Sequence, residues 1–372
     1  MSLPIVFALS FALHLYIGAR IAAHLPWPAG LALAVLLLAS AVLVPLSMLA
    51  RRLLRPPAAD RLTWAGMLCM GLFSSLLVLT FMRDLMLLVL SLSNLDAPQW
   101  EQNTAAGVPL LALALSLIGL INARRTAPVV RVTIPMAGLP QPLHGLRIVQ
   151  ISDIHVGPTI KRAYLEAIVQ RVNALEPDLV AITGDLVDGS VHELAQHVAP
   201  LANLRSRHGS FFVTGNHEYY SGVHGWLDEL PRLGVRVLHN EHVVLRHDGA
   251  ELVLAGVPDY SGHHFDPAHR SDPQAALRGA PAGAPRVLLA HQPRTAAAAA
   301  EAGFDLQLSG HTHGGQFLPW MLFVPLQQPY TAGLHQLGRL WIYVSRGTGY
   351  WGPPTRIAAP SEIAELRLAR AG

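Results

Sequence analysis

Cysteine is almost absent from this chain of 372 residues, which contains only Cys69. One cysteine excludes both a disulfide framework and a metal site built from thiolates. Charged residues are also scarce, because they make up 14% of the chain, against roughly a quarter in average soluble domains. Hydrophobic residues reach 51%. This composition argues against an ordinary soluble enzyme and excludes a disordered chain.

A basic surplus is missing from the second part of the chain. Residues 1–125 contain eight arginines and four acidic residues, whereas the remainder contains 19 basic and 20 acidic residues. The balanced second part argues against a nucleic-acid-binding surface. Histidine is distributed the other way, with 17 of its 19 copies between His144 and His335. These contrasts predict a membrane domain at 1–125 and a histidine-rich globular domain at 126–372.

Four apolar stretches precede residue 125, at 3–25, 29–50, 62–92 and about 104–123. A helix needs about 20 apolar residues to cross a bilayer, so we expect four transmembrane helices. No Lys or Arg precedes the first stretch, which is also long for a cleaved signal peptide. The pair Arg83-Asp84 is interpreted as neighbouring charges near the headgroups. With few other polar residues in the spans and no repeat, the region predicts an anchor and not a transporter.

Loop charge predicts the orientation of these helices. Arginines occupy the connection between the second and third spans and the segment after the fourth, whereas the connection between the third and fourth carries Asp96 and Glu101. Arginine-rich loops stay in the cytoplasm. We therefore expect a multi-pass protein of a bacterial inner membrane, with its globular domain on the cytoplasmic side.

Short apolar runs alternate with amphipathic stretches in the second part. Strands are predicted at 146–151, 179–183, 210–214, 251–255, 286–290, 305–308 and 340–345, and helices at 161–175, 191–204 and 295–300. This alternation is typical of an α/β domain with parallel strands covered by helices. By itself it predicts a single sheet.

Five of the predicted strands end in polar residues. These are Asp153 and His155, Asp185 and Asp188, Asn216 and His217, His291, and His311 and His313. Ligand sites in α/β sheets form beyond the carboxyl ends of the strands, and Asp, Asn and His without Cys suit Mn²⁺, Fe²⁺, Zn²⁺ or Mg²⁺. The set is too large for one ion with open positions. It predicts two divalent ions that share one Asp, hold a bridging hydroxide and clamp a phosphoryl group.

The same motifs resemble those of the calcineurin-like metallophosphoesterases over residues 145–365. The resemblance lies in Asp153-x-His155, Gly184-Asp185-x-x-Asp188, Gly215-Asn216-His217-Glu218, His291 and Gly310-His311-x-His313. The four spans, together with His313-Gly314-Gly315-Gln316 and Ser345-Arg346-Gly347-Thr348-Gly349, are similar to a membrane-anchored bacterial subgroup. The resemblance implies an α/β fold with four layers, αββα, in place of a single sheet.

The resemblance also implies residue roles. Asp153, His155 and His313 hold one metal ion, Asn216, His291 and His311 hold the other, and Asp185 bridges both. His217 assists the phosphoryl oxygen or the leaving group, and Asp188 orients it, unless Asp188 only caps a turn. Arg346 and Arg356 are candidates for binding a substrate phosphate, with surface ion pairs as the alternative. The other histidines of this part, such as His239, His242, His263, His264 and His335, are expected to be exposed.

These expectations describe a membrane-anchored phosphoesterase acting on phosphate mono- or diesters, with the bilayer and a phosphoester substrate as partners and no nucleic acid. The anchor favours a lipid-linked substrate such as UDP-diacylglucosamine. The alternatives are a tethered phosphodiesterase of soluble nucleotides and a non-catalytic metal-binding regulator. The apolar segment 317–326, with three aromatic residues, either dips into the inner leaflet beside the site or forms a core strand and its turn.

Overall fold

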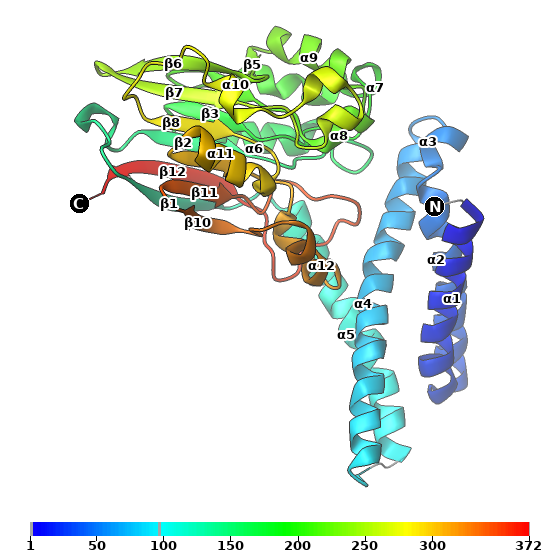
Figure 1. The fold of residues 1–372 in the computed structure, drawn as a ribbon. Coiled ribbons are helices and arrows are strands. Elements are labelled where there is room, and N and C mark those ends of the chain that lie inside the picture. Colours follow the sequence, from blue (N-terminus) through cyan, green and yellow to red (C-terminus); the bar gives the residue numbers. More distant parts are fainter. Residues whose placement is uncertain (1–2, 96–97, 372) are drawn as a thin grey trace. The chain divides into compact units, whose positions relative to one another are not determined.

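The computed structural model describes residues 3–95 and 98–371, which form two compact units (Figure 1). The helical unit comprises the described residues up to Arg124, with Phe317–Pro319 and Gly352–Ile357. The globular unit comprises Arg125–Gln316, Trp320–Trp351 and the described residues from Ala358 onward. Asp96, which entered the loop-charge prediction, lies outside the described residues.

The described residues of the helical unit form long apolar helices and one short helix, α3. They are α1 (Leu3–Ile21), α2 (Trp27–Ser47), α3 (Ala50–Leu53), α4 (Ala58–Leu92) and α5 (Pro98–Arg124). Within the described residues, four segments are long and apolar enough to cross a membrane, namely Leu3–His24, Trp27–Ser47, Ala58–Leu92 and Pro98–Arg124. The four predicted spans are confirmed as helices, and the third and fourth begin earlier than the apolar pattern indicated.

The Arg83-Asp84 pair joins three of these helices. Arg83 on α4 is buried, and it donates from Nε to Thr104 Oγ1 and from Nη2 to the carbonyl oxygen of Glu101, both on α5 and both at 3.0 Å. Asp84 accepts from Arg20 Nε on α1 at 2.9 Å. The charges are therefore paired within the helical unit, as charged residues in membrane helices usually are.

The segment Gly352–Ile357 packs against α5. The backbone N–H of Arg356 donates to the carbonyl oxygen of Gly119 at 3.0 Å, and Asn122 Nδ2 donates to the carbonyl oxygen of Arg356 at 3.3 Å. A Cβ atom on Gly119 would lie 2.8 Å from Thr355 Cγ2, so the absence of a side chain there admits the segment.

The globular unit contains two six-stranded sheets. The first has the order β1 (Val129–Met136), β12 (Ile363–Arg370), β2 (Arg147–Ile151), β3 (Leu179–Ile182), β4 (Ser210–Phe212) and β5 (Val235–Val237). The second has the order β10 (Gly333–Leu337), β11 (Leu340–Val344), β9 (Leu306–Ser309), β8 (Arg286–Leu289), β7 (Ala250–Gly256) and β6 (Glu241–His247). Pairing is parallel from β2 to β5 and from β11 through β9 and β8 to β7, and antiparallel between β12 and β2, β10 and β11, and β6 and β7.

The main hydrophobic core lies between the two sheets. Ile148 and Leu179 of the first sheet share it with Leu254 and Leu306 of the second. The helices that connect the strands are α6 (Arg162–Asn173), α7 (Val191–Val198), α8 (Asn216–Tyr220), α9 (Val223–Arg232), α10 (Pro273–Ala276), α11 (Ala296–Ala302) and α12 (Trp320–Gln327). On the second sheet, α11 packs against the face turned away from this core, and parallel crossovers put connecting helices on the sheet faces.

The αββα fold is thus confirmed, and the single sheet predicted by strand alternation alone is wrong. The central strands of both sheets are buried along nearly their whole length, so the strands of one sheet resemble those of the other in sequence. The local pattern therefore cannot assign a strand to its sheet.

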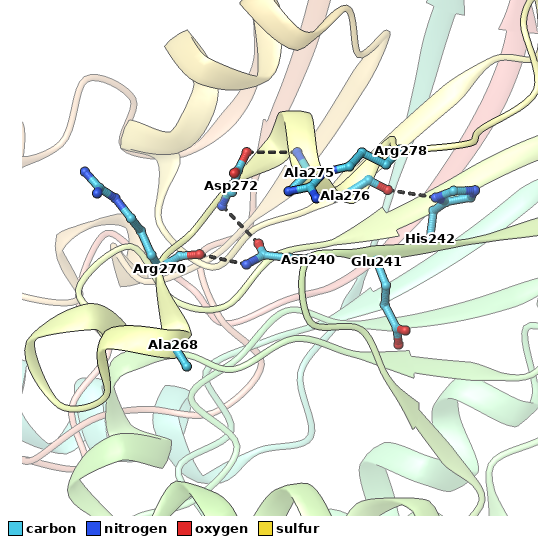
Figure 2. Close-up of a pocket in the computed structure, with 9 residues that line it drawn as sticks. All are labelled: Asn240, Glu241, His242, Ala268, Arg270, Asp272, Ala275, Ala276 and Arg278. Atoms are coloured by element: carbon cyan, nitrogen blue, oxygen red, sulfur yellow. Dashed lines mark hydrogen bonds between the residues drawn. The ribbon is translucent and has the colours of Figure 1, made fainter.

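The long connection between β7 and β8, residues 257–285, is an excursion from the second sheet that is attached to the turn before β6 (Figure 2). Asn240 Nδ2 donates to the carbonyl oxygen of Arg270 at 2.7 Å, and Asn240 Oδ1 accepts from the backbone N–H of Asp272 at 2.9 Å. On β6, His242 Nδ1 lies 2.7 Å from the carbonyl oxygen of Ala276. Side-chain and backbone bonds therefore hold this long connection in place.

Candidate metal centre

All seven predicted ligands lie in the globular unit, just beyond the carboxyl ends of strands from both sheets. In the first sheet, β2 leads to Asp153 and His155, β3 to Asp185, and β4 to Asn216. In the second sheet, β8 leads to His291, and β9 leads to His311 and His313. The centre therefore depends on how the two sheets are packed.

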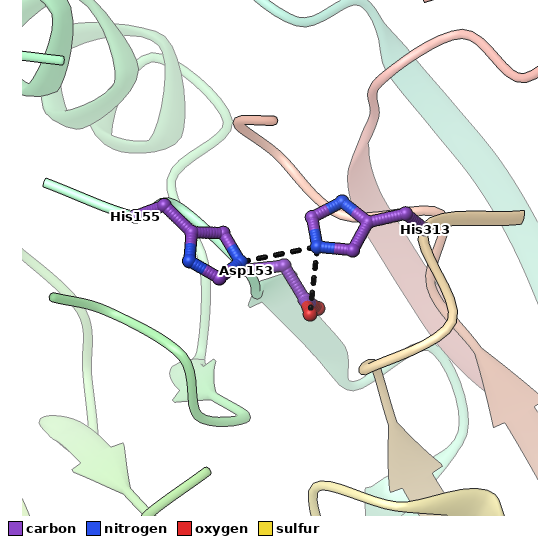
Figure 3. A group of neighbouring side chains, drawn as sticks. All are labelled: Asp153, His155 and His313. Atoms are coloured by element: carbon purple, nitrogen blue, oxygen red, sulfur yellow. Dashed lines mark hydrogen bonds and ion pairs between the residues drawn. The ribbon is translucent and has the colours of Figure 1, made fainter. Parts of the chain in front are cut away.

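One group of three side chains comes together from the two sheets (Figure 3). His155 Nε2 lies 3.1 Å from His313 Nε2, and His313 Nε2 lies 3.4 Å from Asp153 Oδ1. All three side chains are buried. Two imidazole nitrogens at such a distance, both facing one carboxylate, form a set of donors directed at a common point.

A second group lies beside the first and consists of Asp185, His291 and His311. His291 Nε2 lies 3.2 Å from both Asp185 Oδ2 and His311 Nδ1. His291 Nδ1 lies 2.7 Å from the carbonyl oxygen of Thr183, which fixes the ring with Nε2 toward the site. Asp185 Oδ2 is also 3.9 Å from His155 Nε2 of the first group. One carboxylate oxygen thus faces both groups.

Burial and neighbouring side chains together set the protonation states in this second group. Burial alone would raise the pKa of Asp185, but the imidazoles of His291 and His217 lower it well below its usual range. Burial, together with the neighbouring His291, lowers the pKa of His311 to about 3. The Asp185 carboxylate is therefore ionised and the His311 ring neutral at pH 7, which are the forms that bind metal ions. The charge of Asp185 outweighs burial and raises the pKa of His291 well above its usual range, so a metal ion bound there would displace a proton from this ring.

Asn216 supplies a buried oxygen without a donor. Among the residues that the structure describes, its Oδ1 has no hydrogen-bond partner. A buried acceptor without a donor is costly, and a cation in the site would satisfy it. The side chains present therefore fit a metal centre in both their chemistry and their spacing.

His217 and Asp188 form a pair at the edge of the two groups. His217 Nδ1 lies 2.6 Å from Asp188 Oδ1, which is also 3.1 Å from His155 Nδ1. Burial lowers the pKa of His217, but the charge of Asp185 and the hydrogen bond to Asp188 outweigh it and raise that pKa to about 9. His217 is therefore protonated at pH 7, and Asp188 holds both this ring and that of His155.

The backbone around the site is strained. Of the eleven described non-glycine residues with positive φ, five are Asp153, His155, Asp185, His311 and His313, with φ between 51° and 72°. Left-handed conformations of this kind cost free energy for residues with a Cβ atom and gather at functional sites. The strain supports a functional interpretation independently of the side chains.

Two glycines let these loops approach each other. A Cβ atom on Gly215 would collide with Asp185 Oδ1, and one on Gly310 would collide with Ser152 Oγ and Asp153 Oδ2. Neither glycine has a positive φ. Close approach to the carboxylates, and not backbone conformation, is therefore the reason for glycine at both positions.

Comparison with known proteins agrees with this geometry. Residues 146–315 match the family of calcineurin-like phosphoesterases. An uncharacterized metallophosphoesterase of Campylobacter jejuni is 37% identical over 264 residues, which are 70% of this chain and 68% of that protein. The chain belongs to the calcineurin-like phosphoesterases.

Relatives in this phosphoesterase family include proteins named for a membrane region. A transmembrane protein with metallophosphoesterase domain from Danio rerio is 42% identical over 270 residues, covering 70% of this chain and 62% of that protein. The chain thus spans about six tenths of the length of that relative. An uncharacterized metallophosphoesterase of Aquifex aeolicus is 35% identical, covering 59% of this chain and 83% of that protein.

The two arginines predicted to bind a substrate phosphate both have structural contacts. Arg346 Nη1 donates to the buried carboxylate of Glu362 at 2.9 Å. Arg356 is fully buried and belongs to the helical unit, where its peptide groups bond to α5. Their role in binding phosphate stays a prediction.

The expectation that five other histidines are exposed is mostly wrong. His264 is exposed, whereas His239, His242, His263 and His335 are half-buried. Each of these four contacts a ring or a backbone carbonyl group. For His239 and His242 the partners are about thirty residues away, so residue type alone could not reveal them.

Two aromatic residues beside His217 were missed by the sequence analysis. Ring centroids of Tyr220 and Trp351 lie 5.2 and 6.0 Å from that of His217. Both contacts are edge-on. Both rings contact the imidazole, and no spacing in the sequence connects Trp351 with His217.

Glu218 is the most consequential residue that the sequence analysis left without a role. Its buried carboxylate accepts four backbone hydrogen bonds at 2.6–3.3 Å, from Asp185, Leu186, Val187 and Gly215. It therefore joins the loop of Asp185 to the loop of His217. The signal was present in the sequence, because a Glu three residues after a helix N-cap commonly accepts from the backbone N–H of that residue, here Gly215.

Replacing Glu218 by Gln should destabilise the globular unit. The amide presents an N–H₂ group to backbone donors, and each buried backbone N–H left without an acceptor costs about 1–3 kcal/mol. We expect Glu218→Gln to lower the free energy of unfolding by about 3 kcal/mol, measured by denaturation of the detergent-solubilised protein. Glu301→Gln, at an exposed glutamate, is the control. Equal stability of the two variants would contradict the role of Glu218.

Proposed function

We propose that this chain is a membrane-anchored, metal-dependent phosphoesterase that hydrolyses phosphate mono- or diesters. The observation that carries the proposal is the position of Asp185 Oδ2, 3.2 Å from His291 Nε2 in one group and 3.9 Å from His155 Nε2 in the other. A carboxylate between two ligand sets suits a pair of divalent ions. Membership of the phosphoesterase family supports the reaction class.

The donor separations support ions bound directly by these side chains. Bonds of about 2.0–2.2 Å to one tetrahedral ion put its ligands roughly 3.3 Å apart, and four separations within the two groups are 3.1–3.4 Å. We assign Asp153, His155 and His313 to one ion, Asn216, His291 and His311 to the other, and Asp185 to both. Mn²⁺, Fe²⁺, Zn²⁺ and Mg²⁺ all accept such ligands.

The proposed chemistry divides between the ions and His217. When bound, two divalent ions would activate a water molecule and neutralise phosphoryl oxygens. Nδ1 of His217 donates to Asp188, so Nε2 carries the proton that can pass to the leaving oxygen of the ester. The pKa of about 9 keeps that proton in place at pH 7. Asp188 keeps the ring in the orientation and protonation state that this transfer needs.

Two variants test the reaction. Asp185→Asn weakens the carboxylate between the two groups, and His217→Ala removes the proton donor, so each should lower kcat at least ~100-fold. The measurement is hydrolysis of p-nitrophenyl phosphate and bis-p-nitrophenyl phosphate by detergent-solubilised protein with Mn²⁺. Removal of metal by a chelator should abolish turnover, and added Mn²⁺ should restore it.

His192→Ala, at an exposed histidine on α7, is the matched control and should retain full activity. Turnover that survives both chelation and the two variants would overturn the proposal. Bound metal without hydrolysis of either ester would instead favour the non-catalytic regulator, and the preferred ester would separate monoesterase from diesterase activity.

We further propose that the substrate is lipid-linked. The supporting feature is α12, which follows the loop of His311 and His313 and, within the described structure, buries none of its side chains. Leu322 is 64% exposed, Phe323 47% and Leu326 80%. A Cβ atom on Gly315 would collide with Met321, so α12 begins directly against the metal-site loop. An exposed apolar helix beside the centre suits the headgroup region of a bilayer, and the alternative of a core strand is wrong.

Removing the apolar surface of α12 tests this substrate class. The double variant Trp320→Ser/Phe323→Ser should reduce hydrolysis of UDP-diacylglucosamine in bilayer vesicles ~10-fold, because less apolar area enters the bilayer. Hydrolysis of p-nitrophenyl phosphate should not change. Val244→Ser, at an exposed valine on β6, is the control. Equal loss on both substrates, or no hydrolysis of the lipid by the unaltered protein, would count against a lipid-linked substrate.

We also propose that the globular unit faces the cytoplasm of a bacterial inner membrane. The arginines of the segment between α2 and α4, including Arg51, Arg52 and Arg55, support this orientation. The segment between α4 and α5 ends near Glu101 and carries no basic residue. The order of charges is therefore consistent with both termini inside.

Cysteine labelling can test the orientation, because Cys69 is the single cysteine. In a Cys69→Ala background, a membrane-impermeant maleimide should label Ser93→Cys in intact bacterial cells but not Arg55→Cys. Both variants should be labelled once the cells are permeabilised. Labelling of Arg55→Cys alone in intact cells would reverse the proposed topology.

A further inference from the structure

A second cluster of metal-binding side chains lies in the globular unit apart from the seven predicted ligands. His224, near the start of α9, meets Asp266 and His269 from the excursion between β7 and β8. One ligand atom from each lies within 4.8 Å of the other two. His224 Nε2 is 3.3 Å from Asp266 Oδ2, and His269 Nε2 is 3.7 Å from the same oxygen. Two imidazole nitrogens therefore face one carboxylate oxygen.

The cluster is oriented by bonds to its outer atoms. His269 Nδ1 lies 3.0 Å from the hydroxyl group of Tyr219. That hydroxyl group can in turn donate a hydrogen bond to Thr214 Oγ1, which is 3.4 Å away. In that arrangement Nδ1–H donates to Tyr219, and Nε2 keeps a lone pair toward Asp266. Asp266 Oδ1 accepts from the backbone N–H of Ala268 at 2.9 Å, which leaves Oδ2 for the cluster. Partners of this kind are what metal-binding histidines and carboxylates usually have.

The segment that carries Asp266 and His269 is also held from its other side. His239 packs edge-on against the ring of His269, with ring centroids 4.2 Å apart. The neighbouring Asn240 bonds to the carbonyl oxygen of Arg270 and to the backbone N–H of Asp272 (Figure 2). The imidazole of His269 therefore has little freedom to turn, so its Nε2 is held in place before a ligand arrives.

We propose that His224, Asp266 and His269 form a separate site for a borderline divalent cation of the Zn²⁺ class. Two nitrogens and one carboxylate oxygen are a ligand set that Zn²⁺ accepts, with one position left for water. The separations of 3.3 and 3.7 Å are near the roughly 3.3 Å expected between ligands of one tetrahedral ion. The side chain of His224 is 71% exposed, so an ion can enter from solvent.

The site would tie the excursion to α9, and the excursion also contacts α8, the helix that carries His217. Tyr219, which contacts His269, lies on α8 two residues after His217. Phe265, next to Asp266, packs against both Tyr219 and Tyr220, with ring centroids 5.5 Å apart in each pair. A cation at the cluster joins α9 to this loop. Its role is therefore structural, because the cluster has no residue in common with the groups of the centre.

The test is the difference in metal content between matched variants of the full-length protein. After loading with Zn²⁺ and removal of free metal, elemental analysis of His224→Ala should give one Zn²⁺ per chain fewer than the unaltered protein. Asp266→Asn, which keeps an oxygen to cap Ala268, should lose the same ion. His264→Ala, an exposed histidine of the same loop, should retain it. The bound ion should also raise the melting temperature of the unaltered protein above that of His224→Ala.

The difference in Zn²⁺ content between the unaltered protein and His224→Ala does not depend on the centre at the strand ends. A chain without phosphoesterase activity would therefore still show this difference. His224 is exposed, so its replacement is compatible with folding. Equal Zn²⁺ content in the unaltered protein and in His224→Ala would overturn the proposal. So would the loss of one ion from His264→Ala as well, because that result means general binding to surface histidines.

Discussion

The buried carboxylate of Glu218 is the contact on which the geometry of the centre depends. It accepts four backbone hydrogen bonds, three from the loop after β3 and one from Gly215. The first loop carries Asp185 and Asp188, and the second leads to His217. Because a buried N–H group without a partner is costly, these bonds set the spacing of the loops. Because the backbone holds the two loops at this spacing, His217 and Asp188 lie within hydrogen-bond distance of each other.

The rest of the centre depends on the packing of one sheet on the other. Gln150 of β2 donates from Nε2 to the carbonyl oxygen of Ser309 on β9 at 2.9 Å, and to Thr183 Oγ1 at 2.8 Å. This bond crosses between the sheets beside the strand ends that carry Asp153 and His311. The apolar core between the sheets stabilises the arrangement as a whole. It can therefore offset the cost of left-handed residues and buried charges at the site.

The excursion between β7 and β8 is likewise held in place by contacts with neighbouring elements. Asn240 and His242 attach it to β6, and Phe265 attaches it to α8. The cluster of His224, Asp266 and His269 sits where α9 and this excursion meet. The excursion is thus a packed part of the globular unit with its own polar centre, and the helix that carries His217 is among its neighbours.

Much of this could be predicted from the sequence because the information is local. Apolar runs near bilayer length predict the four helices, and a polar residue after each of five buried strands predicts the centre. The resemblance to a known family added the second sheet. Glu218 was also within reach, because a Glu three residues after a helix N-cap commonly bonds back to the backbone N–H of that residue. Strand ends and helix starts are recognisable from a few neighbouring residues.

The sequence by itself therefore determined the four apolar helices, the α/β class and the list of side chains at the strand ends. Only the tertiary structure decided which sheet each strand joins, that Asp185 faces both histidine groups, and that His224 meets His269. These features depend on contacts between residues tens of positions apart. Such contacts are formed by the packing of two sheets with the same local pattern, so no stretch of the sequence contains them.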